Sequence, residues 1–105
     1  MVEISKSDWK LFREKVPQWQ ENYMEQLTKE YIKLLSSPGN ASDHFWELEK
    51  RIKIDKKHPG VLIEMRKSNA IWDIAMYVRD EVITMDDLSE FSEDLVDAVK
   101  LILSR

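Results

Sequence analysis

The sequence predicts an all-helical fold, a compact bundle of four to five amphipathic helices that forms a single helical domain over residues 1–105. Two observations carry this prediction. The chain has only two glycines and three prolines, which are too few turn residues for a β-sheet protein. Apolar side chains also recur every three or four residues along most of the chain, the spacing of one face of an α-helix.

A first helix should begin at Ser5, because its hydroxyl can cap the helix and Asp8 follows three residues later. Pro17 interrupts the pattern, since it lacks an amide donor and disfavours helical geometry at the preceding residue. The apolar stripe keeps its phase across Pro17, so the segment is either one kinked helix or two helices. Beyond Pro17 the stripe consists of Trp19, Tyr23, Leu27, Tyr31 and Leu34.

The next helix should follow the loop at residues 36–40, with Ser42 as its cap. It has its own apolar stripe at helical spacing, with one large ring beside the stripe. These residues are Phe45, Leu48 and Ile52, and Trp46 beside them.

A fourth helix is expected from about residue 61 to about residue 81, after a break at residues 58–60. Residues 70–78 within it are apolar on nearly every side. Such a helix is either central in its bundle or covered by another chain. In the second case, the predicted interface residues are Ile71, Trp72, Met76 and Tyr77.

A fifth helix should open at Thr84, which forms a capping-box pattern with Asp87, and Ser92 can restart it within one turn. Its apolar stripe completes the predicted core, in which eleven residues should be largely buried. They are Trp19, Leu27, Tyr31, Phe45, Ile52, Trp72, Ile74, Val78, Leu88, Phe91 and Leu95.

The net charge of −4 is unevenly distributed, since residues 70–105 carry nine acids and only three bases. This acidic balance argues against nucleic acid as a partner. A nucleic-acid-associated regulator therefore remains the weaker alternative. It rests on a basic run at Lys50, Arg51, Lys53, Lys56 and Lys57.

No catalytic, cofactor or metal motif is recognisable, so we expect no enzyme activity, no cofactor and no metal site. Cysteine is absent, which excludes disulfides, thiolate ligands and a cysteine nucleophile. His44 precedes Glu47 by three residues, but a catalytic zinc site normally needs three protein ligands. Asp73 lies in the most apolar stretch without a histidine or second acid at helical spacing. We interpret it as an acid at the rim of its helix or as the partner of a base.

Four tryptophans are unusual for a chain of this length, and we interpret them as core residues that each bury a large area. The alternative is a small-molecule binding protein that holds an aromatic or cationic ligand in a Trp-rich pocket. The pocket residues would be Trp9, Trp19, Trp46 and Trp72.

Membrane and export signals are not apparent in the sequence. No stretch approaches the roughly 18 apolar residues of a membrane span. The first residues also lack the apolar run of a signal peptide. We therefore expect a cytoplasmic protein with no membrane partner.

Strings such as SDWKLFREK (7–15), FWELEKRI (45–52), KKHPGV (56–61) and EMRKS (64–68) resemble small uncharacterised helical proteins of anaerobic Gram-positive bacteria. This resemblance implies a bacterial, cytoplasmic protein and assigns no site residue. The lack of a catalytic or cofactor motif and the broadly apolar segment at residues 70–78 lead us to expect a non-enzymatic interaction or accessory protein. Such a protein would act by self-association, as a homodimer, or by binding another protein.

Overall fold

Helices are the regular elements of the computed structural model, which describes residues 3–105. No strand occurs in that range, and the all-helical prediction is confirmed. No helix within the same range is both long and apolar enough to span a membrane. In chain order the elements are α1 (Lys6–Ser36), α2 (Ala41–Asp55), the 3-10 helix η1 (Lys67–Asn69), α3 (Ala70–Arg79), the 3-10 helix η2 (Met85–Leu88) and α4 (Glu93–Leu103).

α1 is one continuous helix of 31 residues with Pro17 inside it. It begins as predicted, because the Ser5 hydroxyl oxygen accepts a hydrogen bond from the Asp8 amide at 3.1 Å. A proline inside a helix removes one backbone hydrogen bond. Burial of Val16 and Trp19, on either side of Pro17, offsets that loss. The stripe that keeps its phase across Pro17 therefore belongs to one helix.

The core lies where the N-terminal half of α1 meets α3, η2 and α4. Its aromatic centre consists of Phe12, Trp19, Tyr77 and Phe91, whose tilted or edge-to-face pairs have ring centroids 6.1 to 6.5 Å apart. The burial prediction is confirmed for six of the eleven residues. They are Trp19, Leu27, Ile74, Leu88, Phe91 and Leu95.

For Phe45, Ile52 and Trp72 the burial prediction is wrong, because all three are exposed. Tyr31 and Val78 are half-buried. Phe45 and Ile52 are exposed because α1 covers only part of the surface of α2, which has no buried residue. Its apolar stripe is wider than the strip of surface that α1 covers. Trp72 lies on the outward side of the short helix α3.

Residues 61–66 form an irregular segment, whereas the sequence predicted the first turns of the fourth helix. Half-buried and exposed side chains alternate along this segment, and two of them, Ile63 and Met65, pack against the core. Alternation with a period of two belongs to an extended chain, since a helix would turn successive side chains by about 100°. The fourth predicted helix is therefore reduced to α3 and the single turn η1.

Local capping signals mark two of the other helix starts, those of η2 and α4. The Asp87 carboxylate accepts a hydrogen bond from the Thr84 amide at 2.7 Å, but this predicted box opens only the short turn η2. The Ser92 hydroxyl accepts from the Leu95 amide at 3.2 Å and begins α4. α2 begins directly after Asn40, so Ser42 lies inside the helix and does not cap it.

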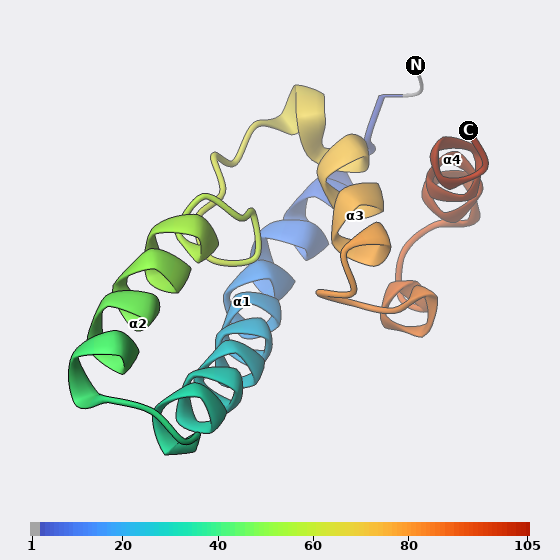
Figure 1. Cartoon of the computed structure of the whole chain (residues 1–105). Coiled ribbons are helices and arrows are strands. Elements are labelled where there is room, and N and C mark those ends of the chain that lie inside the picture. Colours follow the sequence, from blue (N-terminus) through green and yellow to red (C-terminus); the bar gives the residue numbers. More distant parts are fainter. Residues whose placement is uncertain (1–2) are drawn as a thin grey trace.

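The molecule is elongated rather than compact, with principal extents of 52 × 23 × 22 Å. Its radius of gyration is 16.5 Å, whereas a compact domain of this length has about 13 Å. Figure 1 shows α2 beside the C-terminal half of α1, and α3 and α4 toward its N-terminal half. We call residues 20–55 the hairpin. Leu27 is the one buried residue that the structure describes within it.

Candidate interaction surface

Side-chain contacts between α1 and α2 hold the hairpin together. Arg51 on α2 pairs with Glu30 on α1 at 3.6 Å. The Tyr31 hydroxyl donates a hydrogen bond to the Asp55 carboxylate, and the Arg51 guanidinium lies 5.6 Å from the centre of the Tyr31 ring. Burial, followed by this hydrogen bond, raises the pKa of Tyr31 to about 12. The hydroxyl therefore remains a donor at neutral pH.

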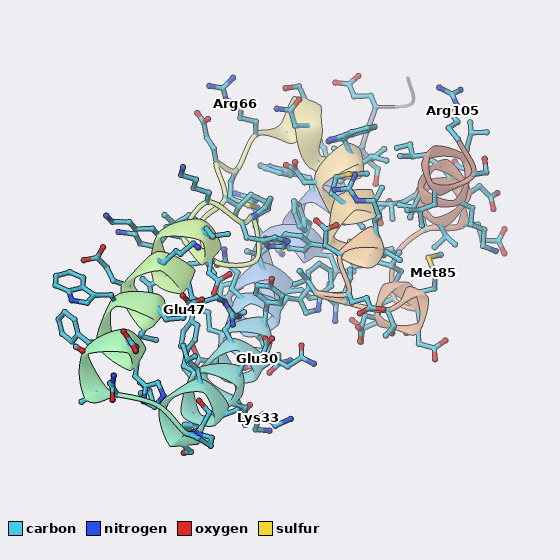
Figure 2. The ribbon with its side chains drawn as sticks, in the orientation of Figure 1. Glu30, Lys33, Glu47, Arg66, Met85 and Arg105 are labelled. Carbon is cyan, nitrogen blue, oxygen red and sulfur yellow. The ribbon has the colours of Figure 1, made fainter. Side chains whose placement is uncertain are left out.

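The hairpin has two unlike sides, and the Glu30–Arg51 ion pair marks one of them. Each successive residue lies about 100° further round a helix. Tyr31 follows Glu30 on α1, and Ile52 follows Arg51 on α2. Because α1 and α2 run antiparallel, Tyr31 and Ile52 both lie toward the side of the hairpin opposite the ion pair. Glu47 precedes Arg51 by four residues and shares the polar side with Glu30. Both of these acids are labelled in Figure 2.

The side opposite the ion pair carries exposed apolar side chains. Met24 and Leu35 lie seven residues before and four residues after Tyr31, so they share its side of α1. Phe45 lies seven residues before Ile52 and shares its side of α2. We call this surface the apolar face. It consists of Met24, Leu35, Phe45 and Ile52, with Ile32 and Trp46 at its edges.

The exposure of the apolar face is large. Ile32 is 62% exposed, and Phe45 and Trp46 are each 61% exposed. The Phe45 and Trp46 rings meet edge to face at 5.0 Å. A large side chain can bury roughly 200 Å², so the six residues together expose on the order of 600 Å². Exposed apolar side chains of this total area that gather on one part of a chain mark an interaction site.

A polar cluster at the base of the hairpin connects it to the core. The Tyr23 ring stacks on His58 at 4.8 Å. His58 Nδ1 accepts a hydrogen bond from the Gly60 amide at 2.9 Å, and its Nε2 lies 3.2 Å from the Asp80 carboxylate. An imidazole that accepts at Nδ1 carries its proton on Nε2, the atom that faces Asp80. These contacts join α1, the turn after α2 and the end of α3.

Two further contacts fix the same turn. The Arg79 guanidinium donates to Asp80 at 2.9 Å and lowers the pKa of that carboxyl, which keeps it ionised beside His58. The Tyr77 hydroxyl donates to the Pro59 carbonyl at 2.7 Å, and burial raises the pKa of Tyr77 to about 12. The hairpin therefore projects from a firmly held base.

Of the interface residues predicted on α3, Ile71 and Tyr77 are buried within the chain. The prediction that they need cover from a second chain is wrong for these two, because they pack in the core between α1 and α4. Met76 is half-buried against the core, and Trp72 is exposed. α3 thus offers one large exposed ring and no broad apolar surface.

The four tryptophans do not come together in one pocket, contrary to the alternative prediction. Trp19 lies in the core, and the half-buried Trp9 lies beside Phe12 at 6.1 Å. Trp46 and Trp72 are exposed on α2 and α3 respectively. A core ring on α1 and two exposed rings on different helices do not line one pocket.

The polar candidates of the sequence are dispersed. His44 Nε2 lies 3.4 Å from the Ser37 hydroxyl, at the tip of the hairpin. Within residues 3–105 no group of three potential metal ligands gathers. Asp73 is half-buried on α3, and burial raises its pKa to about 6. In the basic run of α2, Lys53 pairs with Glu49 at 3.1 Å.

Comparisons of the chain with protein-family models, with curated proteins and with solved structures gave no match. The geometry of the hairpin is therefore the basis for assigning a site.

The sequence did not predict the apolar face, because its residues follow the spacing of a core stripe. One signal in the sequence points to it. Trp46 and Ile54 lie outside the stripe formed by Phe45, Leu48 and Ile52. α2 is therefore apolar on more than one side, which is typical of a helix with more than one neighbour.

Proposed function

We propose that this chain is a non-enzymatic interaction protein that binds a protein partner through the apolar face of its hairpin. The observation that carries the proposal is the exposure of Ile32, Phe45 and Trp46, each above 60%. Removing such side chains from water is favourable roughly in proportion to the area covered.

The sparse packing within the hairpin supports the same function. α1 and α2 share Leu27 as their one buried residue in the hairpin, and most helical stability in proteins comes from packing of an apolar face. A partner on the apolar face would supply that packing. Binding and hairpin stability would then be linked, because a partner that binds only the folded hairpin stabilises it.

The rigid base of the hairpin also suits a binding role. The stacked Tyr23 and His58 rings and the Tyr77–Pro59 hydrogen bond hold the hairpin against the core. A surface presented in one orientation loses less conformational freedom when a partner binds.

Site-specific photo-cross-linking in living cells that express the protein tests this function. A benzophenone side chain placed at Phe45, on the apolar face, should give a discrete protein adduct. The matched control is the same group at Leu101 on α4, which is 57% exposed and lies outside the hairpin. Equal adducts at both positions, or none at Phe45, would contradict the proposal.

A further inference from the structure

We infer that the partner is a second copy of this chain, seated on the apolar face so that two hairpins form one antiparallel four-helix bundle. The inference rests on the proposed function, because it names the occupant of the same face. In a symmetric dimer the same patch lies on both copies, so each apolar face would cover the other.

The shape of the hairpin suits this occupant. Two antiparallel helices with one free apolar side are half of a four-helix bundle. A second hairpin matches the first in length and spacing because it is identical. No other element of residues 3–105 is placed to supply those two helices, since α3 and α4 pack together near the other end of α1.

The aromatic rings of the core do not obstruct a second hairpin. Phe12 precedes Glu30 by 18 residues, which is a whole number of helical turns, and Trp19 precedes Glu30 by 11, which is nearly so. The two core rings therefore leave α1 on the same side as Glu30. That is the side opposite Tyr31, Met24 and Leu35, so these two rings and the apolar face lie on opposite sides of α1. Residues 61–65 lie beside Pro17, which precedes Met24 by seven residues, and they bound the apolar face at its base end.

The apolar area supplies most of what a standard dimer interface buries, and polar neighbours would supply the rest. A standard interface buries about 800 Å² on each partner, and the six residues of the apolar face and its edges expose on the order of 600 Å². Two exposed polar residues lie within the face, since Thr28 follows Met24 by four residues and Glu49 follows Phe45 by four. They would supply polar contacts inside the interface.

Charges at the edges of the apolar face select the arrangement. Glu21 precedes Met24 by three residues and borders the face on α1, and Lys56 follows Ile52 by four and borders it on α2. Both lie at the base end of the hairpin. A two-fold axis parallel to the hairpin would set α1 of one copy against α2 of the other, and Glu21 near the second copy's Lys56. Such complementary rims fix the register of an interface.

The molar mass of the purified protein in solution tests the inference. Light scattering after size exclusion should give about 25 kDa at micromolar concentration, twice the chain mass of 12.5 kDa. Phe45→Glu should raise the dissociation constant about 10-fold or more, because it replaces a large apolar contact with a charge one turn from the like charge of Glu49. Leu101→Glu, an equally polar change at an exposed leucine on α4, should leave the mass at 25 kDa.

Charge reversal provides a second test that does not threaten folding, since Glu21 and Lys56 are both exposed. Glu21→Lys and Lys56→Glu should each raise the dissociation constant severalfold in low salt. The double variant should restore the wild-type value, because the opposite charges again face each other across the interface. Additive losses in the double variant would overturn the arrangement of α1 against the second copy's α2.

Failure of this inference is distinguishable from failure of the proposed function. A mass of 12.5 kDa that persists at high micromolar concentration would overturn the second copy as partner. If the Phe45 cross-linker then gave an adduct with a different protein, the interaction function would stand. A dimer that Phe45→Glu leaves intact and Leu101→Glu dissociates would move the interface away from the hairpin and overturn the inference.

Discussion

Asp8 and Ser92, 84 residues apart, join the start of the first helix to the start of the last. The Asp8 carboxylate accepts hydrogen bonds from the Ser92 amide at 3.1 Å and from the Ser92 hydroxyl at 2.5 Å. Asp8 is the one buried charged residue that the structure describes. A carboxylate at this point also interacts favourably with the positive end of the α4 dipole.

Asp8→Ala should lower the free energy of unfolding by about 2–3 kcal/mol, because it leaves the Ser92 amide without its charged acceptor. Urea unfolding followed by circular dichroism measures this loss. Asp94→Ala is the matched control, since Asp94 is an exposed acid in the first turn of the same helix. It should cost about 0.5 kcal/mol or less. Similar losses in the two variants would show that the Asp8–Ser92 hydrogen bonds contribute no more to the free energy of unfolding than an exposed acid does.

Gly60→Ala should destabilise the protein by about 1–3 kcal/mol through overpacking. A Cβ atom at position 60 would lie 2.5 Å from Cδ2 of the Tyr23 ring, so the ring must move off its stack with His58. Thermal unfolding measures the effect.

The same Gly60→Ala change in a Tyr23→Leu background separates the steric cause from any backbone effect. The smaller side chain removes the obstruction, so the additional loss should fall to about 0.5 kcal/mol or less. A loss of the same size in both backgrounds would rule out the Tyr23 ring as the cause.

Asp73→Asn should stabilise the protein at neutral pH. Burial raises the pKa of Asp73 from 3.8 to about 6, so the folded state disfavours the ionised form. The contribution of Asp73 to stability therefore decreases as the pH rises from about 4 to about 6. Because Asp73 is only half-buried and solvent screens its charge, the substitution should raise the free energy of unfolding by about 1 kcal/mol at pH 7, and by much less at pH 4.

Urea titrations of both proteins across this pH range measure the Asp73 effect. The exposed acid Asp97 supplies a control, since Asp97→Asn should give a difference that hardly depends on pH. A difference between wild type and Asp73→Asn that is constant from pH 4 to pH 7 would contradict the assigned role of burial.

Leu27→Ala and Phe91→Ala should each lower the free energy of unfolding by about 2–5 kcal/mol, because both side chains are buried and their loss leaves a cavity. Phe45→Ala should change it by about 0.5 kcal/mol or less when the protein is dilute enough to be monomeric. At high concentration the same Phe45 variant should lose stability relative to wild type, since the wild-type dimer is stabilised by association. Equal losses for Phe45 and Phe91 in dilute solution would place Phe45 in a core.

Sequence alone determined the helical class and most local signals. Ser5, Thr84 with Asp87, and Ser92 act where their spacing predicts, because a cap and its partner amide lie within one turn. Trp19 and Leu88 are buried as their stripes predict. These features depend on residues a few positions apart, which the sequence displays directly.

The tertiary structure decided which apolar stripes find a neighbour within the chain. Phe45 and Ile71 both follow core-like patterns, yet Phe45 is exposed on the hairpin and Ile71 is buried against the core. Residues 61–66 leave the helical pattern because the core offers Ile63 and Met65 a surface to pack on. Burial depends on how distant elements meet in space, and the spacing of residues along one element carries no information about that.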